Sequence, residues 1–555
     1  MRMESHNNPV TSLSLNQSLE DAVQNRRFNR QALGGLSPAD QKKFEAFGRG
    51  PERQISHHAI HQAFELQALK QEKAIAAQHK QENISYGELN RKASWLAVQL
   101  ATMGIGQGNN VGLFLERSIH MLVGLVGILK TGAAYVPQDV RITPESTLID
   151  VMDSADIHIV LTLSHLVEKI PVRDYQRVLA IDSLDFPKSG DQQSWSMTVP
   201  RSAASHGDNC FILFTSGTTG KPNGVRVTHG NVCNILLTAP GNLGIKPGYK
   251  VSQLLNIAFD MAAWEILGCL AHGGTLVIRE NDFTETAKQC DVIIATPSIL
   301  AKVNADQCQR IKSVAVAGEP CPRSLAENWA GRCRFINSCG PTETTIINTA
   351  QHFRPHSMAL TIGKPTPNNT VYVLDEHMQP CAMGEVGEIW AGGKGVSAGY
   401  INNARLTRER YQPDPFMADG SLMFRTRDLA RWNEEGELEH FGRTDDQVKV
   451  KGFRVELDAI SNVIESAGLC QQAVTMKLND KELVTFVRPA NSSIEKCLKA
   501  IEDRLPYYCL PSSVVALSEF PLTTRGKTDK QALLAMIQKK ENPAETKSEK
   551  EGAVA

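Results

Sequence analysis

Short apolar runs alternate with helical patterns over much of this chain, and that alternation limits the folds open to it. Strands are expected at residues 111–116, 157–163, 210–214, 292–296 and 314–317, and helices at 60–72 and 119–129. Short buried runs separated by helices are typical of a parallel sheet that is covered on both faces. We therefore expect an α/β fold whose large N-terminal domain contains doubly wound sheets.

The pattern changes after about Phe424, where the segments become shorter and more β-like. Such segments occur at residues 437–441, 447–457, 473–478 and 483–488. A chain of 555 residues is expected to form two or more domains. We predict a leader or linker at 1–55, a large domain at 56–445, a small mobile α/β domain at 446–540 and a disordered, charged tail at 541–555.

Charge and cysteine usage argue against several classes of function. The 59 Lys and Arg residues balance 60 Asp and Glu residues, so no strong field points to nucleic acid or to a membrane surface. The longest apolar run, residues 121–129, is too short to cross a bilayer, and the polar N-terminus lacks the apolar core of a secretory signal. The 12 cysteines form no C-x-x-C pair, which argues against a structural zinc site. These features indicate a reduced, cytoplasmic protein.

A segment rich in Thr, Ser and Gly follows the third expected strand directly, because residues 211–225 read FILFTSGTTGKPNGV. Glycines let the backbone approach a ligand, and exposed N–H groups and hydroxyls can surround a polyphosphate. The segment is not a Walker A loop, since Lys221 is followed by Pro222. A flexible surface loop is the alternative, but the preceding strand favours a phosphate loop. Its candidate binding residues are Thr215, Ser216, Gly217, Thr218, Thr219, Gly220 and Lys221.

This loop resembles the phosphate-loop signature of the adenylate-forming (AMP-binding) superfamily, which includes acyl-CoA synthetases, luciferases and the adenylation domains of nonribosomal peptide synthetases. Other segments resemble that superfamily's motifs in the same order: 130–139 (KTGAAYVPQD), 318–320 (GEP), 337–343 (NSCGPTE), 424–429 (FRTRDL), 442–452 (GRTDDQVKVKG) and 521–527 (PLTTRGK). The resemblance implies an enzyme that uses ATP and Mg²⁺ to convert a carboxylic acid into an acyl-adenylate.

The resemblance also implies roles for the matching residues around the nucleotide. Thr342 would hydrogen-bond a phosphate, and Glu343 would bind Mg²⁺, which prefers carboxylate and phosphate oxygens. Asp428 would accept hydrogen bonds from the ribose hydroxyls, and Arg443 would contact ribose or phosphate. The adenine pocket would be lined by Gly318, Glu319 and Cys339.

Two further residues would act through the small domain. Lys527 matches the family's catalytic lysine, whose ammonium would stabilise the charge that builds up when a carboxylate attacks the α-phosphorus of ATP. Asp445 matches the hinge, at which the small domain would swing between two catalytic poses. Together with Thr342 and Glu343, Lys527 completes the expected catalytic set.

The segment 259–265, FDMAAWE, resembles the F-D-x-S-x-W-E segment of nonribosomal peptide synthetase adenylation domains. The resemblance implies that Asp260 pairs with the α-ammonium of an amino acid, the cationic partner that a buried carboxylate needs. The leader also resembles the linker before adenylation domains of fungal type. By the same resemblance, the side-chain pocket would be formed by Met261, Trp264, Ala295, Ala315, Ala317, Ser338, Ile346 and Ile347. These apolar and small residues would leave room for a bulky apolar or aromatic side chain.

The acyl acceptor is expected to be a separate molecule, because residues 528–555 leave no room for a carrier domain after Lys527. A carrier protein bearing phosphopantetheine is our first expectation, and an acyl- or aryl-CoA ligase is the alternative. Three departures from the family pattern favour a third hypothesis, a catalytically impaired binding protein. Asn223 replaces a lysine, Arg427 replaces a glycine, and Cys339 replaces an aromatic residue that would stack on adenine.

Overall fold

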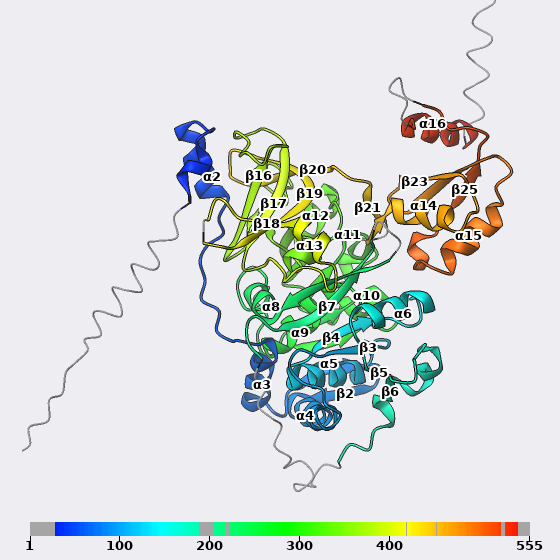
Figure 1. Cartoon of the computed structure of the whole chain (residues 1–555). Coiled ribbons are helices and arrows are strands. Elements are labelled where there is room, and N and C mark those ends of the chain that lie inside the picture. Colours follow the sequence, from blue (N-terminus) through cyan, green and yellow to red (C-terminus); the bar gives the residue numbers. More distant parts are fainter. Residues whose placement is uncertain are drawn as a thin grey trace, which may run out of the picture.

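The computed structural model describes residues 28–187, 204–217, 221–417, 419–450, 452–522 and 528–541. Figure 1 shows a large body formed by the described residues before about 446, with a smaller body beside it formed by the described residues that follow. The predicted tail at 541–555 lies outside the described residues except for its first residue. Within these ranges, no helix is both long and apolar enough to cross a membrane.

A six-stranded sheet carries the candidate phosphate loop. Its order is β6-β5-β3-β4-β7-β8. Only β7 and β8 pair antiparallel, which confirms the expected mainly parallel sheet. Its strands are β3 (Asn110–Phe114), β4 (Ala134–Gln138), β5 (Ile159–Thr162), β6 (Arg177–Ala180), β7 (Asn209–Thr215) and β8 (Asn223–Thr228). The helical elements that follow its strands are α5 (Ile119–Thr131), α6 (Glu145–Ser154), η2 (Ser164–Lys169), η3 (Ile181–Ser183) and α8 (His229–Leu236).

A nine-stranded sheet lies next along the chain, in the order β15-β14-β13-β12-β11-β9-β10-β1-β2. Its strands are β1 (Ile75–His79), β2 (Glu82–Ser85), β9 (Lys250–Gln253), β10 (Thr275–Ile278), β11 (Val292–Ala295), β12 (Ser313–Val316), β13 (Arg334–Cys339), β14 (Thr349–Phe353) and β15 (Lys364–Pro365). Its helical elements are α3 (Ile60–Lys70), α4 (Tyr86–Thr102), α9 (Asp260–Ala271), α10 (Phe283–Ala287), α11 (Pro297–Leu300), η4 (Ala305–Gln307), α12 (Arg323–Ala330) and η5 (Thr342–Thr344). One continuous core joins the two sheets, and α5 and α9 are buried almost all round because both are apolar on every face.

A third, antiparallel sheet holds the ribose motif. It comprises β16 (Asn369–Leu374), β17 (Gly387–Gly393), β18 (Tyr411–Pro413), β19 (Leu422–Trp432) and β20 (Leu438–Arg443), with α13 (Ala404–Arg410) beside it. The expected leader is partly folded onto this sheet. Helices η1 (Arg30–Leu33) and α2 (Pro38–Phe47) pack there because Phe44 stacks on Tyr372 with ring centroids 5.5 Å apart. This segment is held on the sheet by a cluster of buried aromatic side chains, although its sequence lacks a sustained apolar periodicity.

The smaller body begins with a two-stranded hairpin, β21 (Gln447–Val450) and β22 (Phe453–Glu456). The expected β-like segment at 447–457 is therefore two strands. A three-stranded sheet follows, formed by β23 (Gln472–Asn479), β24 (Glu482–Arg488) and β25 (Ser513–Ala516). Its helical elements are α14 (Leu457–Ser466), α15 (Ile494–Glu502), η6 (Tyr507–Cys509) and α16 (Lys530–Glu541). Residues 444–446 join β20 to β21, and so join the two bodies; we call them the junction.

Candidate active site

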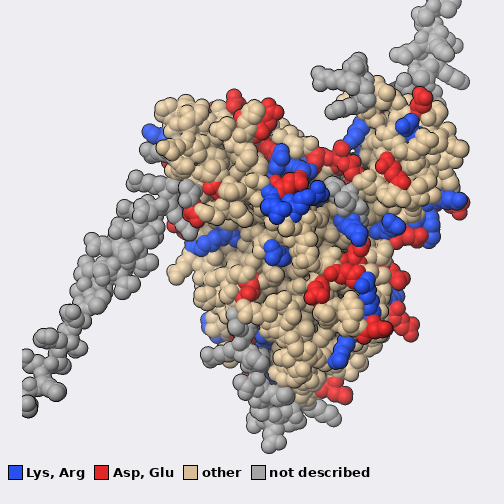
Figure 2. Space-filling view, in the orientation of Figure 1, with Lys and Arg blue, Asp and Glu red and all other residues tan. Residues whose placement is uncertain are grey.

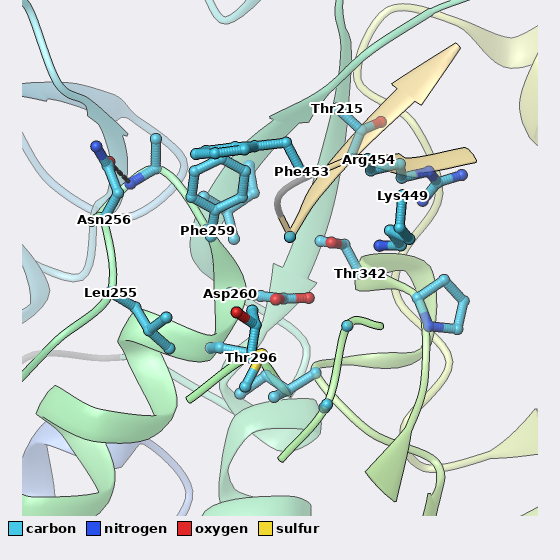
Figure 3. Close-up of a pocket in the computed structure, with 18 of the residues that line it drawn as sticks. Thr215, Leu255, Asn256, Phe259, Asp260, Thr296, Thr342, Lys449, Phe453 and Arg454 are labelled. Atoms are coloured by element: carbon cyan, nitrogen blue, oxygen red, sulfur yellow. Dashed lines mark hydrogen bonds between the residues drawn. The ribbon is translucent and has the colours of Figure 1, made fainter. Parts of the chain in front are cut away.

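A cavity of about 130 Å³ lies where strand ends of the large body meet the β21–β22 hairpin (Figure 3). Parallel α/β sheets place ligand sites at the carboxyl ends of their strands. The large body contributes Leu213 to Ser216, Leu255, Asn256, Ala258 to Met261, Thr296, Ile299, Ala317, Gly318, Gly340 to Thr342 and Ile346. The small body contributes Lys449, Gly452 to Arg454 and Tyr508. The structure thus brings together segments that are far apart in the sequence.

Glu343, the expected Mg²⁺ ligand, is a buried carboxylate whose two oxygens both accept hydrogen bonds. Tyr400 Oη donates to Oε1 over 2.7 Å, and Arg454 Nη1 donates to Oε2 over 2.8 Å. Burial alone would raise the pKa of Glu343, but the charges of Arg454 and Arg410 and these hydrogen bonds lower it to about 2. Glu343 is therefore ionised, and in this pose it is engaged by a cation from the small body.

Asp260 lies at the start of α9 and faces the cavity (Figure 3). Burial raises the pKa of its carboxyl group, while a hydrogen bond with Thr342 and the charge of Lys449 oppose that shift. Among the described residues, no Lys, Arg or His nitrogen lies within 4.0 Å of this carboxylate. The floor of the cavity therefore carries a carboxyl group that has no direct ion-pair partner among the described residues.

The expected side-chain pocket is only partly on the cavity surface. Asp260, Met261, Ala317 and Ile346 line it, whereas the structure places the remaining predicted wall residues deeper, namely Trp264, Ala295, Ala315, Ser338 and Ile347. Ala295 packs in the core cluster on the other side of its sheet, and its neighbour Thr296 lines the cavity instead, because side chains alternate along a strand. Trp264 donates from Nε1 to the carbonyl oxygen of Gly241 over 2.6 Å.

Two of the residues expected around adenine, Gly318 and Glu319, lie near Gly452 at the tip of the hairpin. The Glu319 carboxylate accepts hydrogen bonds from the Ser298 amide (2.8 Å) and hydroxyl (3.0 Å), so it holds α11 in place. Gly452 has a φ of 88°, and a Cβ there would lie 3.2 Å from Thr296 and 3.3 Å from Glu319 Oε1. Both the left-handed backbone and the close approach favour glycine. Burial raises the pKa of the Cys339 thiol to about 12, so this residue is a neutral thiol.

The expected ribose site is a network of ion pairs. Arg443 Nη1 donates to Asp428 Oδ1 over 2.8 Å, and His440 Nε2 lies 3.4 Å from the same oxygen. Burial would raise the pKa of Asp428, but His440 and Arg443 outweigh it and lower the pKa. Arg427 does not crowd this carboxylate, because its guanidinium points towards Glu409 and Asp445 instead.

The phosphate loop is described at both ends. Gly217 permits a close turn, since a Cβ there would lie 2.1 Å from the carbonyl oxygen of Lys221. Ser216 Oγ donates to the Arg454 carbonyl oxygen over 3.1 Å, which ties the loop to the hairpin. Lys221 is largely exposed, with Nζ 3.7 Å from Asp150 of α6. The predicted ligand-binding residues Thr218, Thr219 and Gly220, and the predicted catalytic Lys527, lie outside the described residues.

Sequence reasoning missed several residues that shape the site. Arg454, Lys449 and Phe453 enter it from the hairpin, and Phe453 stacks on Tyr508 with centroids 4.1 Å apart. Phe453 and Arg454 directly follow the matched hinge segment, which was the available signal. Glu265 was quoted only as part of a motif, yet it is buried and accepts hydrogen bonds from the amides of residues 254 (2.6 Å) and 255 (3.1 Å). It thereby fixes the loop that leads to α9, and burial raises its pKa to about 8.

Comparisons with known proteins agree with this arrangement. A family profile described as "AMP-binding enzyme" matches residues 64–401. Adenylate-forming reductase 03009 of Coprinopsis cinerea is 44% identical over 93% of this chain and 50% of that protein, so the chain spans about half that relative's length. Gramicidin S synthase 1 of Brevibacillus brevis is 31% identical over 85% of this chain and 44% of that protein.

The same fold occurs in a solved structure. An artificially fused adenylation–PCP di-domain nonribosomal peptide synthetase, NpsA-ThdA from Klebsiella oxytoca, superimposes with a TM-score of 0.72 at 23% identity, covering 83% of this chain and 94% of that one. The family match shows that this chain belongs to the AMP-binding enzyme family.

Proposed function

We propose that this chain activates an α-amino acid with ATP, forming aminoacyl-AMP and pyrophosphate, and passes the aminoacyl group to the thiol of a separate carrier protein. The observation that carries the proposal is Asp260, a carboxylate at the cavity floor without a direct ion-pair partner among the described residues. Ionising a carboxyl group that is partly withdrawn from water is costly, and a substrate ammonium would stabilise its ionised form. Met261, Ala317 and Ile346 give the adjoining wall an apolar surface, which favours a bulky apolar or aromatic side chain.

ATP would lie along the motifs that surround the cavity. Gly318 and Cys339 would border adenine, Asp428 and Arg443 would bind the ribose, and the phosphate loop with Thr342 would hold the phosphates. The substrate carboxylate oxygen would then attack the α-phosphorus, the bond to the bridging oxygen would break, and pyrophosphate would leave with that electron pair. Lys527 is assigned to stabilise the charge on the phosphate oxygens in that transition state.

Mg²⁺ would be held by Glu343, and when bound it neutralises part of the charge on the phosphates. The residue fits this role because its buried carboxylate already binds a cation in this pose, where Arg454 helps to lower its pKa to about 2. The fit requires that Arg454 first leave Glu343 Oε2, which it binds in this pose. We therefore propose that the pose described here follows adenylation, and that a second pose of the small domain carries out adenylation itself.

A second cavity, of about 70 Å³, supports transfer to a carrier. It adjoins the first cavity at Phe214 to Ser216, Phe259 and Tyr508, and its other walls come from both bodies, including Thr147 and Leu505. Its lining is mostly uncharged, which suits a thin, neutral arm such as the pantetheine part of phosphopantetheine. The cytoplasm remains the expected location of this reaction.

ATP–pyrophosphate exchange tests the proposal. A panel of α-amino acids and the matching carboxylic acids without an amino group is assayed with Mg²⁺ and ATP, with free coenzyme A added in a parallel series. Exchange that depends on an amino acid is the expected result. Exchange only with carboxylates that lack the amino group, or consumption of coenzyme A with them, would replace the proposal with an acyl- or aryl-CoA ligase. ATP binding without exchange for any acid would indicate an impaired binding protein.

A further inference from the structure

Arg427 lies beside the junction, and its side chain forms ion pairs with Glu409 of the large body and with Asp445 of the junction. Figure 2 shows basic and acidic side chains mixed on the large body beside the smaller one. Nη1 is 3.4 Å from Asp445 Oδ2, and Nη2 is 3.2 Å from Glu409 Oε1 on α13. Glu409 belongs to the large body, whereas Asp445 is the middle residue of the segment that leads to β21. The guanidinium therefore bridges a fixed helix and the junction.

The backbone of Arg427 adopts an unusual conformation that aims the side chain in this direction. Its φ is 65°, in the left-handed region that non-glycine residues seldom occupy. The Arg427 amide donates to Glu388 Oε1 over 3.1 Å, and its carbonyl oxygen accepts from the Thr444 amide over 2.9 Å. Such strain persists only where surrounding contacts hold it, and it tends to occur at functional positions.

The charge of Asp445 does not require Arg427. Arg443 already grips the Asp445 carboxylate with two hydrogen bonds, from Nε over 2.8 Å and from Nη2 over 3.1 Å. Arg443 also binds Asp428, so that pair links the junction to the ribose site. What Arg427 adds is a connection from Asp445 to α13 through Glu409, which Arg443 does not make. Arg427 therefore contributes by attaching the junction to α13 more than by balancing the charge of Asp445.

We propose that Arg427 is a positioning residue that braces the junction in the pose described here and sets how readily the small domain leaves that pose. This inference rests on the proposed function, because it assumes that the small domain adopts one pose for adenylation and another for acyl transfer. Partly exposed ion pairs of this kind are weak, so the expected change in the balance between the poses is about two- to five-fold. Because the contacts are partly exposed, salt should weaken the brace.

Hydrogen–deuterium exchange of the full chain without substrates measures directly how firmly the junction is held. Arg427→Gln keeps a side chain of similar length without charge, and Arg427→Gly also relieves the backbone strain. We expect amides at residues 444–447 to exchange about two- to five-fold faster in both variants, and wild-type protein at about 1 M KCl to approach them. The matched control is Arg431→Ala, on the same strand as Arg427. It removes an ion pair to Glu439 of β20 and should leave these amides unchanged. If the amides at residues 444–447 of Arg427→Gln exchange hydrogen at the wild-type rate, the proposal is overturned, whatever the rate in Arg427→Gly.

An activity measurement separates this proposal from the proposed function. The ratio of acyl transfer to free pantetheine over ATP–pyrophosphate exchange should fall about two- to five-fold in both Arg427 variants and stay constant in Arg431→Ala. An unchanged ratio together with unchanged hydrogen exchange would refute the brace. If wild-type protein catalyses neither reaction with any amino acid, the proposed function fails, and the hydrogen exchange of residues 444–447 still decides whether Arg427 braces the junction.

Discussion

Arg454 Nη1 lies 2.8 Å from Glu343 Oε2, so a cation from the small body neutralises the buried carboxylate that we assign to Mg²⁺. The same arginine's carbonyl oxygen accepts the hydroxyl of Ser216 in the phosphate loop. One residue of the hairpin thus occupies the expected metal ligand and contacts the expected phosphate cradle. Mg²⁺ and the Arg454 guanidinium would therefore compete for the Glu343 carboxylate.

Replacing Arg454 with Ala should separate the two proposed steps. Removing one partner of a buried ion pair costs about 3–5 kcal/mol in the state that contains it. Under our proposal the pair is present in the pose described here and absent from the adenylation pose, so acyl transfer to pantetheine should fall at least about tenfold, whereas ATP–pyrophosphate exchange should be retained. Equal loss of both activities in a variant that remains folded by circular dichroism would show that Arg454 also serves adenylation.

Replacing Asp260 with Asn should remove the preference for α-amino acids. The substitution keeps the shape of the side chain but loses the charge that would face the ammonium, a hydrogen-bonded contact worth about 1.5–3 kcal/mol. The expected result is a roughly 10- to 100-fold fall in kcat/KM for amino-acid-dependent exchange, with a much smaller effect on the matching deamino acid. A uniform fall for both substrates would contradict the assigned role.

Replacing Lys527 with Ala should lower the exchange rate sharply without changing stability. A positioned charge that stabilises a transition state contributes about 10²- to 10³-fold to kcat. The KM for ATP should change much less, because the contact is made mainly in the transition state. Thermal unfolding of the variant serves as the control for folding, and an unchanged exchange rate would remove Lys527 from the mechanism.

A buried histidine pair predicts the pH dependence of stability. His61 of α3 and His229 of α8 lie with ring centroids 5.5 Å apart. Burial lowers the pKa of each to about 3, assisted by Lys130 at His61 and by His61 at His229. Both are neutral in the folded state, whereas in the unfolded state they bind protons below about pH 6.5.

The free energy of unfolding should therefore be independent of these histidines above about pH 7 and should fall as the pH drops from about 6.5 towards about 3. The slope is at most about 1.4 kcal/mol per pH unit for each histidine. Urea unfolding at pH 7.5, 6.0 and 5.0 measures this slope, and His61→Gln should reduce it. A variant with the wild-type slope would show that other groups control acid stability.

Much of the fold follows from local patterns in the sequence. The apolar run at 210–214 and its polar continuation predicted β7 and the loop after it, and the run at 119–129 predicted α5. These predictions succeed because burial on both faces leaves a continuous apolar run, which can be recognised without knowledge of the partners. The expected wall residue Ala295 instead packs on the other side of its sheet, since a displacement of one residue along a strand exchanges the two faces.

The order of the motifs predicted the family of this protein, because the phosphate-loop segment, Glu343 and Asp428 follow one another as that family's motifs do, and the family match confirms that prediction. Only the tertiary structure decided what those residues touch. Glu343, Tyr400 and Arg454 meet across 57 and 111 positions of sequence, and Arg427 turns towards Asp445 rather than the ribose carboxylate. Local patterns report burial and turns, whereas the charge state of Glu343 and the pose of the small body depend on distances between elements that only folding brings together.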